Sequence, residues 1–348
     1  MSRPAPLPPP ILSVRHLKVQ YRSRRTWPWQ PRGWVRALDD LHLDLRPGET
    51  LGIVGESGCG KSTLARALVG LQATSSGSIR YGGQDLTKLS KSEWRPLRRE
   101  LQMVFQDPLA SLNPKLTVGQ IVAEPLRELC PEIPAAEHPQ RVAAMLERVG
   151  LSGDILERKP HEFSGGQAQR IGIARALIVR PKVLICDEAV SALDVSVRAQ
   201  IVNLLVELRQ EYGLTLIFIA HDLAIVRYLC DRVLVMYLGK VMEQAASTEL
   251  FAAPKHPYTR ALLAAAPSAS APPQPAGNKK GRKKRKTLSG NLPSPALPPM
   301  GCVFHTRCPL METACVASVP NLRRVGPDHY AACHFVAAPD SVSNNTSG

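Results

Sequence analysis

GESGCGKST occupies residues 55–63 and is a glycine-rich segment that ends in a lysine and two hydroxyl residues. It fits the pattern G-x-x-x-x-G-K-[ST], follows the apolar residues LGIV and leads into the helix-like sequence STLARALVG. Between a strand and a helix, this pattern is typical of a loop whose backbone amides and helix N-terminus bind nucleotide phosphates. We therefore predict that the following residues contact a nucleotide: Gly55, Glu56, Ser57, Gly58, Cys59, Gly60, Lys61, Ser62 and Thr63.

A second apolar segment, VLICDE at residues 183–188, ends in two acids. In phosphate-loop proteins the loop lysine reaches the β- and γ-phosphates, and the hydroxyl group after it binds Mg²⁺. Lys61 and Ser62 fit these roles, and Asp187 is expected to complete the magnesium site. Glu188 can then polarise the water that attacks the γ-phosphate. Two acids at a strand end are often only solvated, but beside a phosphate loop they predict a hydrolytic site.

The sequence FSGGQAQR at residues 163–170 opens another helix-like run with a hydroxyl group and two glycines. Ser164, Gly165 and Gly166 would present backbone amides at the helix N-terminus, an arrangement that favours an anion. The alternative is a serine that only caps its own helix. The chain thus has two candidate anion sites, and only one of them belongs to the phosphate loop.

Composition and charge exclude several classes of protein. The 348 residues are 44% hydrophobic and can bury a large core, but apolar segments such as LTLIFIA at 214–220 are far shorter than the ~20 residues of a membrane-spanning helix. The N-terminus lacks the apolar core of a signal peptide, so we expect a cytosolic protein. The net charge is +15, and seven of the 44 basic residues lie in KKGRKKRK at 279–286. We expect this run to be a solvated linker, with anionic lipid or nucleic acid contacts as alternatives.

The order of patterns along the chain predicts its organisation. Short strand-like segments extend to about residue 85, helical patterning follows, and strands then alternate with helices, which predicts a doubly wound α/β sheet. The expected regions are a disordered tail at 1–10, a main domain at 11–266 with a helical part at about 107–165, a linker with the basic run at 267–300, a compact cysteine-bearing extension at 301–335 and a disordered tail at 336–348.

In their order, these motifs resemble those of the ATP-binding cassette (ABC) ATPases, and the resemblance extends from Ile11 to about Pro267. Gln106 ends the apolar segment LQMVFQ between the phosphate loop and the signature sequence FSGGQ. The acidic strand is followed by the SALD loop with Asp194 and by His221 in IAHD. The resemblance implies a P-loop nucleotide-binding domain with a RecA-like core, an antiparallel β subdomain and a helical signature subdomain.

The same resemblance implies roles for individual residues. Two cassettes of this family pack head to tail, so the signature sequence of one chain would contact the ATP bound by the other. Glu188, His221 and Gln106 would form the catalytic group, Gln106 would bind Mg²⁺ with Ser62 and Asp187, Tyr21 would stack on adenine, Asp194 would lie in the dimer loop, and Ser164, Gly165, Gly166 and Gln167 would contact the partner's ATP.

Several segments are similar to one subfamily, the importers of dipeptides, oligopeptides or, in some relatives, nickel. They include FQDPLASLNPKLTVGQIVAEPL, KHPYTRALLAAAP and LSGNLPSPALPPMGCVFHTRCP, and the last favours the dipeptide branch. The resemblance implies an ATPase at the cytoplasmic face of the inner membrane that drives import. Its expected partners are a second, different cassette subunit, two membrane permeases and an extracytoplasmic peptide-binding protein. The alternatives are an energising subunit for nickel or another small solute and, in a different class, a soluble ABC protein associated with nucleic acid.

Four of the eight cysteines crowd the C-terminal region: Cys302, Cys308, Cys315 and Cys333. A chain without an export signal is not expected to form disulfides, so these thiols are candidate metal ligands. Their spacing, C-x₅-C-x₆-C-x₁₇-C, matches neither zinc ribbons nor ferredoxin runs. Some peptide-importer cassettes carry a [4Fe–4S] cluster in this region, and the resemblance therefore favours one. Zinc, or four unliganded thiols in a packed extension, are the alternatives.

Overall fold

The computed structural model describes residues 8–22, 33–265 and 292–336. Most of the expected N-terminal tail, the basic run at 279–286 with most of its linker, and the expected C-terminal tail from residue 337 onward lie outside the described residues. Nothing in the structure therefore bears on the alternatives for the basic run.

A four-stranded antiparallel sheet contains the first strands of the chain, in the order β2-β1-β4-β5. Apolar residues alternate along β1 and β2, and their buried members, such as Leu12, Val14 and Leu43, form one core with the apolar face of α1. The strands are β1 Leu12–Arg22, β2 Trp34–Leu45, β4 Ser76–Tyr81 and β5 Gln84–Asp85.

An eight-stranded sheet forms the centre of the molecule, in the order β11-β12-β10-β9-β3-β8-β7-β6. The five strands from β9 to β6 are parallel, and every residue of β3, β7, β8 and β9 is buried, as expected for a parallel sheet covered on both faces. The strands are β3 Thr50–Val54, β6 Leu101–Val104, β7 Val183–Asp187, β8 Thr215–Ile219, β9 Arg232–Tyr237, β10 Lys240–Ala246, β11 Arg323–Gly326 and β12 His329–Ala331.

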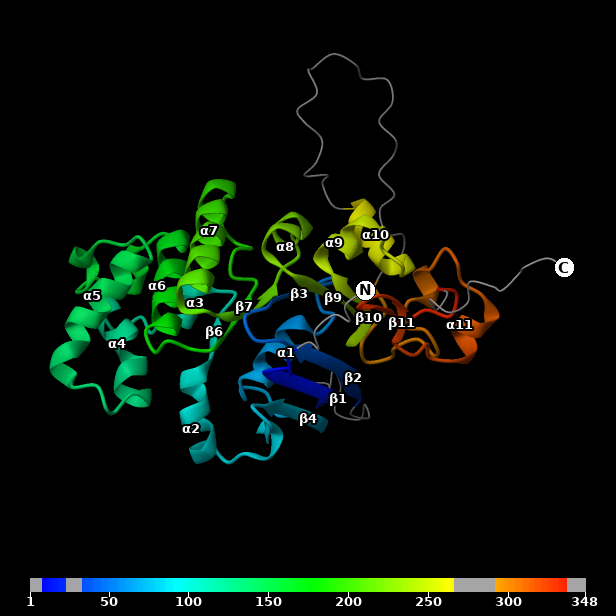
Figure 1. The fold of residues 1–348 in the computed structure, drawn as a ribbon, viewed down its shortest axis with the longest axis horizontal. Helices are drawn as coiled ribbons and strands as arrows, with labels where there is room; N and C mark the ends of the chain where they lie inside the picture. Colours follow the sequence, from blue (N-terminus) through cyan, green and yellow to red (C-terminus); the bar gives the residue numbers. More distant parts are fainter. Residues whose placement is uncertain (1–7, 23–32, 266–291, 337–348) are drawn as a thin grey trace, which may run out of the picture.

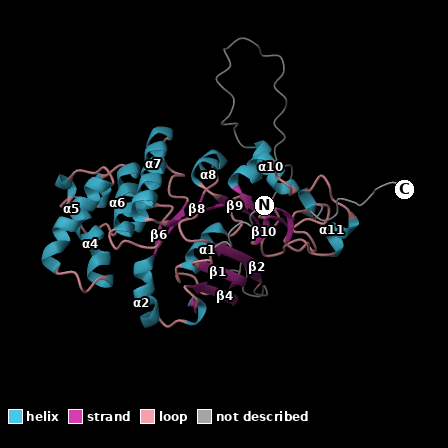
Figure 2. Ribbon diagram, in the orientation of Figure 1, coloured by secondary structure: helices cyan, strands magenta, loops and turns pink. Residues whose placement is uncertain are grey.

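Helices cover this sheet and form a separate group at one end of the molecule, where α4 and α5 pack with α6 (Figures 1 and 2). The α-helices are α1 Lys61–Leu68, α2 Lys91–Glu100, α3 Pro108–Ser111, α4 Val118–Leu129, α5 His138–Arg148, α6 Gly165–Leu177, α7 Val195–Tyr212, α8 Leu223–Leu229, α9 Ser247–Ala252, α10 Pro257–Ala265 and α11 Thr313–Ala317. The short 3₁₀ helices are η1 Leu86–Lys88, η2 Ala135–Glu137, η3 Gly153–Ile155, η4 Pro160–Glu162 and η5 His305–Arg307. No helix in the described ranges is long and apolar enough to cross a membrane.

The parallel core, the antiparallel sheet and the helical group are the three parts that the sequence analysis predicted. The helical group consists of α3, α4, α5 and α6, and its first three helices correspond to the helical patterning expected after residue 107. The structure adds α2, which the sequence analysis did not predict because its composition is strongly polar and it contains Pro96. A capping box between Ser90 and Glu93 begins this helix, and Trp94 is its one buried residue.

The cysteine-bearing extension, expected as a compact region, packs directly on the main domain. Its strand β12 pairs with β10, and β11 pairs with β12, so the extension continues the central sheet. Phe304 of the extension is fully buried in the same core as Tyr237 and Tyr258. Because the chain returns from residue 292 to the edge of a sheet formed much earlier, local patterning could not indicate this pairing.

Candidate active site

The phosphate loop lies between β3 and α1, as the sequence predicts. Gly55 and Gly60 have positive φ angles of 152° and 106°, and a Cβ atom on either would lie 2.2 or 2.4 Å from a backbone oxygen of Met236 or Ala37, respectively. Both positions therefore require glycine. Ser57 and Gly58 are exposed at the tip of the loop, whereas Cys59 is fully buried among apolar residues.

Lys61 is held inside the loop, and its side chain is only 4% exposed. Its Nζ donates hydrogen bonds to the carbonyl oxygens of Gly55 (2.8 Å) and Glu56 (3.1 Å). It also lies 3.9 Å from Oε1 of Glu188. The ammonium group is thus already positioned at the loop, where a bound triphosphate would be.

Ser62 and Asp187 come together from α1 and the end of β7. The Ser62 hydroxyl group donates to Oδ1 of Asp187 at 3.0 Å, and Asp187 is 2% exposed. Burial raises the pKa of Asp187, and the hydrogen bond from Ser62 opposes that rise. A buried carboxylate beside a hydroxyl group is the oxygen-ligand pair that the sequence analysis assigned to magnesium.

Glu188 is the point at which the expected catalytic residues meet. Gln106 Nε2 donates to its Oε2 at 2.8 Å, and Nδ1 of His221 lies 4.0 Å from the same oxygen. Glu188 has a φ of 48°, a left-handed conformation that is uncommon outside glycine. The Ser191 hydroxyl group and backbone amide both donate to the Glu188 carbonyl oxygen, at 2.9 and 3.0 Å, and thereby close the turn after Glu188. Three elements of the chain thus direct their functional groups at one carboxylate.

Tyr21 is the second-last residue of β1 and lies beside the first turn of α1. Its hydroxyl group donates to Oε1 of Gln72 at 3.1 Å, and its oxygen lies 3.4 Å from the Thr63 hydroxyl group, which can donate to it. The tyrosine ring is therefore next to the helix that carries the phosphate loop. This position is compatible with a ring that contacts the nucleotide base, while Thr63 binds the tyrosine.

Glu56 has a different environment from the one expected of an ATP-binding residue. Its carboxylate accepts two hydrogen bonds from Arg307, at 2.6 and 2.9 Å, and its amide donates to the Tyr258 hydroxyl group at 2.9 Å. The Arg307 side chain is 5% exposed and also donates to the Tyr237 hydroxyl group at 3.2 Å. The cysteine-bearing extension therefore holds the phosphate loop directly. Arg307 was not among the residues expected at this site, and the one local feature that could have indicated it is its position before Cys308.

The signature residues begin α6, in the helical group. Ser164 and Gln167 form a capping box, in which the Ser164 hydroxyl oxygen accepts from the Gln167 amide (3.3 Å) and Gln167 Oε1 accepts from the Ser164 amide (3.0 Å). Gly166 lies against α7, because a Cβ atom there would be 2.5 Å from Val197. Ser164, Gly165 and Gln167 are exposed. Within the described chain, no hydrogen bond joins them to the phosphate loop, which leaves this helix start available to another molecule.

A cavity of about 880 Å³ opens beside the acidic residues. Gln106 and Asp187 line it together with Gly165 of the signature sequence and Arg66 of α1. Asp194 lies outside this lining and caps α7, since its Oδ1 accepts from the Val197 amide at 2.9 Å and the Ser196 hydroxyl group at 2.8 Å. The Val197 hydrogen bond is the main cause that lowers the pKa of Asp194.

The structure also brings the four cysteines of the extension together. Burial, and then the proximity of the other three thiols, raise the pKa of Cys302 to about 11. Burial likewise raises the pKa of Cys308, with contributions from Cys333 and Cys315. Cys302, Cys315 and Cys333 are buried, and the Cys302 amide donates to the Cys315 carbonyl oxygen at 2.7 Å. The remaining four cysteines are buried and separate from this group: Cys59, Cys130, Cys186 and Cys230.

Comparison with solved structures agrees with this geometry. A post-hydrolysis dimer of the ATP-binding cassette MJ0796 with ADP and Pi is 27% identical, has a TM-score of 0.61, and the match covers 68% of this chain and 98% of that one. CbiO1 from Clostridium perfringens, described as part of the ABC transporter complex cbiONQ, is 33% identical with a TM-score of 0.60, over 71% of this chain and 92% of that one.

Comparison of sequences is more specific. The family model "ABC transporter" matches residues 38–191, and "Oligopeptide/dipeptide transporter, C-terminal region" matches residues 242–315. The oligopeptide transport ATP-binding proteins OppF of Salmonella typhimurium and Escherichia coli are each 52% identical over 314 residues, which is 90% of this chain and 92% of each relative. A putative peptide import ATP-binding protein of Brucella ovis is 49% identical over 324 residues, 93% of this chain and 97% of the relative. The chain therefore belongs to the ABC transporter ATPases, in the group with the oligopeptide/dipeptide-transporter C-terminal region.

Proposed function

We propose that this chain is the subunit that binds and hydrolyses ATP to drive the import of peptides across a membrane. The observation that supports this most directly is the convergence of Lys61, Gln106 and His221 on Glu188 at the mouth of the phosphate loop. The peptide assignment rests on relatives named for oligopeptide transport and for peptide import. These names favour oligopeptides over the dipeptide branch that the sequence analysis preferred.

The position of each residue at the site supports one role in ATP binding or hydrolysis. The loop amides and Lys61 bind the β- and γ-phosphates, and Glu188 accepts a proton from the attacking water. His221 and Gln106 keep the Glu188 carboxylate oriented towards that water. Ser62, Asp187 and Gln106 are the residues that would hold Mg²⁺, which would neutralise the charge on the phosphate oxygens. Tyr21 contacts the adenine base.

The exposed N-terminus of α6 supports a dimer in which Ser164, Gly165, Gly166 and Gln167 bind the γ-phosphate held by a partner cassette. An anion there would accept hydrogen bonds from the free backbone amides of the first helical turn. Asp194 then lies near the dimer interface, where its cap fixes the start of α7. We propose that the partner is a second, different cassette and that the pair binds two membrane permeases on the inner face of the membrane. A peptide-binding protein on the other side delivers the solute.

We further propose that Cys302, Cys308, Cys315 and Cys333 hold a [4Fe–4S] cluster. The described residues contain one group of three or more metal-ligating side chains with ligand atoms within 4.8 Å of one another, and it contains no cysteine. Four thiolates on one zinc ion would be about 3.8 Å apart, given Zn–S bonds of about 2.3 Å. Thiols that are close but more widely spaced fit a larger inorganic group. A bound cluster would cross-link four points of the extension behind Arg307.

The transport proposal is tested by uptake in cells that lack this chain. Uptake of a labelled oligopeptide, a labelled dipeptide and nickel would be measured after restoring either the wild-type chain or Glu188→Gln. Peptide uptake that returns with the wild type and not with Glu188→Gln supports the proposal. Peptide uptake that never depends on the chain, or nickel uptake alone that does, would refute it.

The cluster proposal is tested by anaerobic purification followed by iron and sulfide analysis. We expect four irons per chain, lost in Cys315→Ser and retained in Cys130→Ser, a buried cysteine of the helical group. Zinc in place of iron would contradict the proposal, as would a metal content that Cys315→Ser leaves unchanged.

A further inference from the structure

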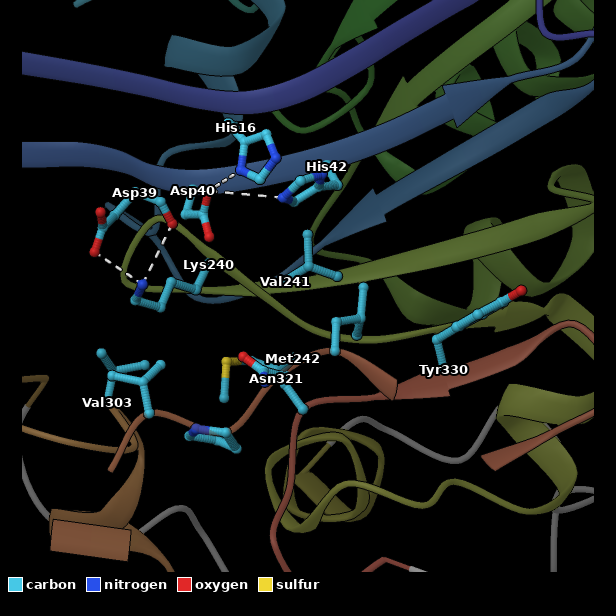
Figure 3. A pocket seen from close by; sticks show the side chains of 14 residues that line it. His16, Asp39, Asp40, His42, Lys240, Val241, Met242, Val303, Asn321 and Tyr330 are labelled. Carbon is cyan, nitrogen blue, oxygen red and sulfur yellow. Dashed lines mark hydrogen bonds and ion pairs between the residues drawn. The ribbon is translucent and has the colours of Figure 1, made fainter. Parts of the chain in front are cut away.

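Two histidines and an aspartate meet on the antiparallel sheet, away from the phosphate loop (Figure 3). His16 Nδ1 lies 2.9 Å from Oδ1 of Asp40, and His42 Nε2 lies 3.6 Å from the same oxygen. The two imidazole rings are in edge contact, with centroids 4.4 Å apart. One ligand atom from each residue lies within 4.8 Å of the others, and this is the one such group among the described residues.

Two β-bulges on opposite strands create the group. Val14 pairs with Leu43 and Leu17 with Leu41, which places an extra residue in β1 next to His16. Leu17 pairs with Leu41 and Val19 with Leu38, which places an extra residue in β2 next to Asp40. His16 and Asp40 both have positive φ angles, 51° and 61°.

These two left-handed residues are costly for the backbone, by about 1–2 kcal/mol each. The neighbouring strand accommodates one of them, because Gly77 lies against the His16 carbonyl group, where a Cβ atom would approach to 2.3 Å. Side chains alternate along a regular strand, so the extra residue at His16 is what returns Leu17 to the buried face of Val14, and the extra residue at Asp40 does the same for Leu38 and Leu41. The bulges have the further result that His16, Asp40 and His42 share one face.

The adjacent residues Asp39 and Asp40 have different charged neighbours. Asp39 is bound by Lys240 at 2.8 Å, with Lys18 at 4.0 Å. Asp40 instead faces the two imidazoles, and its carboxylate is half-exposed. Among the described residues, the close ion pairs of Asp40 are therefore with the two histidines, whereas those of Asp39 are with lysines.

The group opens onto a cavity of about 460 Å³ that separates the antiparallel sheet from the extension. Asn321 and Tyr330 of the extension line its other side, with Met242 of β10. An ion at the three side chains would keep coordination positions facing this cavity, where water or a small ligand can reach them. Borderline divalent cations bind two imidazoles and one carboxylate in open sites of this kind.

We propose that His16, Asp40 and His42 form a binding site for a divalent transition-metal ion of the zinc class, at the junction of the antiparallel sheet and the C-terminal extension. The two imidazoles would bind as neutral ligands through one ring nitrogen each, and Asp40 as a carboxylate. The site needs neither ATP nor the cysteines. It is therefore independent of the proposed transport function and of the cluster.

Equilibrium dialysis of the full-length chain against Zn²⁺ tests the site. All variants retain the eight cysteines, so zinc held by thiols cancels in the comparison. We expect the double variant His16→Gln/His42→Gln to bind one Zn²⁺ fewer per chain than the wild type. The control, His161→Gln, changes an exposed histidine of the helical group and should leave the stoichiometry unchanged. Equal stoichiometry in the wild type and the double variant would overturn the proposal.

The double variant could lose zinc because it misfolds, so a second variant and a Co²⁺ spectrum test the site independently. Asp40→Asn keeps both histidines and should weaken zinc binding by more than about tenfold, since loss of even an outer-shell partner has that effect. With Co²⁺, the difference spectrum of wild type minus double variant should show ligand-field bands without thiolate charge-transfer absorption. Unchanged affinity in Asp40→Asn, or charge-transfer absorption in the difference spectrum, would assign the metal to other residues.

Discussion

The N-termini of α1 and α6 both present glycines and a hydroxyl residue to an anion, but the two helices begin in different ways. Gly60 precedes α1 in a left-handed conformation and makes no side-chain capping hydrogen bond. Ser164 precedes α6 in an extended conformation and forms a complete capping box with Gln167. No side chain caps the first amides of α1, whereas the Ser164 hydroxyl oxygen caps one amide of α6, that of Gln167.

This difference separates a primary binding site from a secondary one. The phosphate loop is fixed from several sides, by Lys61, Tyr258 and Arg307, so a nucleotide meets a preformed cradle. The signature helix is exposed, and the Ser164 hydroxyl group, whose oxygen accepts from the Gln167 amide, can donate its hydrogen to a phosphate oxygen only after a partner brings a nucleotide to it. Binding to α1 should therefore precede the contact with α6.

Glu188→Gln gives the largest expected effect, because it leaves both helix starts intact and removes only the general base. ATP hydrolysis should fall by about 10²- to 10⁴-fold, while ATP binding persists and the dimer remains closed. Phosphate release and size-exclusion chromatography with ATP measure the two parts. If the variant hydrolyses ATP at the wild-type rate in the assembled transporter, Glu188 is not the base.

Lys61→Ala tests the open helix start. ATP hydrolysis should fall by about 10²- to 10³-fold, the range for removal of one positioned donor to a developing oxyanion. Unlike Glu188→Gln, it should also weaken ATP binding, measured with a fluorescent nucleotide. Lys61→Arg is the matched control for charge, and it should restore less than full activity because the loop carbonyl groups fit an ammonium group. Normal binding in Lys61→Ala would show that the amides alone hold the phosphates.

Arg307→Gln tests whether the extension holds the phosphate loop. Loss of the paired hydrogen bonds to Glu56 should lower the free energy of unfolding by about 2 kcal/mol, the range for hydrogen bonds to charged groups. It should also raise the KM for ATP, since the loop is less fixed. Arg324→Gln, on an exposed strand of the same extension, is the control. An equal KM for ATP in the two variants would mean that the Arg307–Glu56 pair stabilises the fold but does not affect nucleotide binding.

Ser164→Ala has the smallest expected effect on stability and distinguishes the two roles of this serine. Loss of the cap should lower the free energy of unfolding by about 1 kcal/mol. Ser90→Ala removes a capping box of the same kind from α2, which has no anion role, and should destabilise by a similar amount. Only Ser164→Ala should also slow ATP hydrolysis in the transporter. Equal rates of ATP hydrolysis in Ser164→Ala and Ser90→Ala would show that Ser164 acts only as a helix cap.

Local sequence determines the open and the capped helix starts, because both depend on residues within a few positions of each other. The glycines, Lys61 and Ser62 form one continuous segment, and Ser164 is three residues from Gln167. The parallel core was predictable for the same reason, since the strand segments LGIV and VLIC contain no polar side chain. The family resemblance supplied the roles of Gln106 and His221, and the structure places both at Glu188.

Tertiary structure alone decided the contacts between distant segments. Arg307 and Glu56 are separated by 251 positions, and neither has a neighbour that indicates the other. The pairing of β12 with β10 and the opposed bulges at His16 and Asp40 likewise depend on which strands become neighbours. Periodicity reports which face of an element is buried, but hydrogen bonds and ion pairs between elements exist only once the chain has brought those elements together.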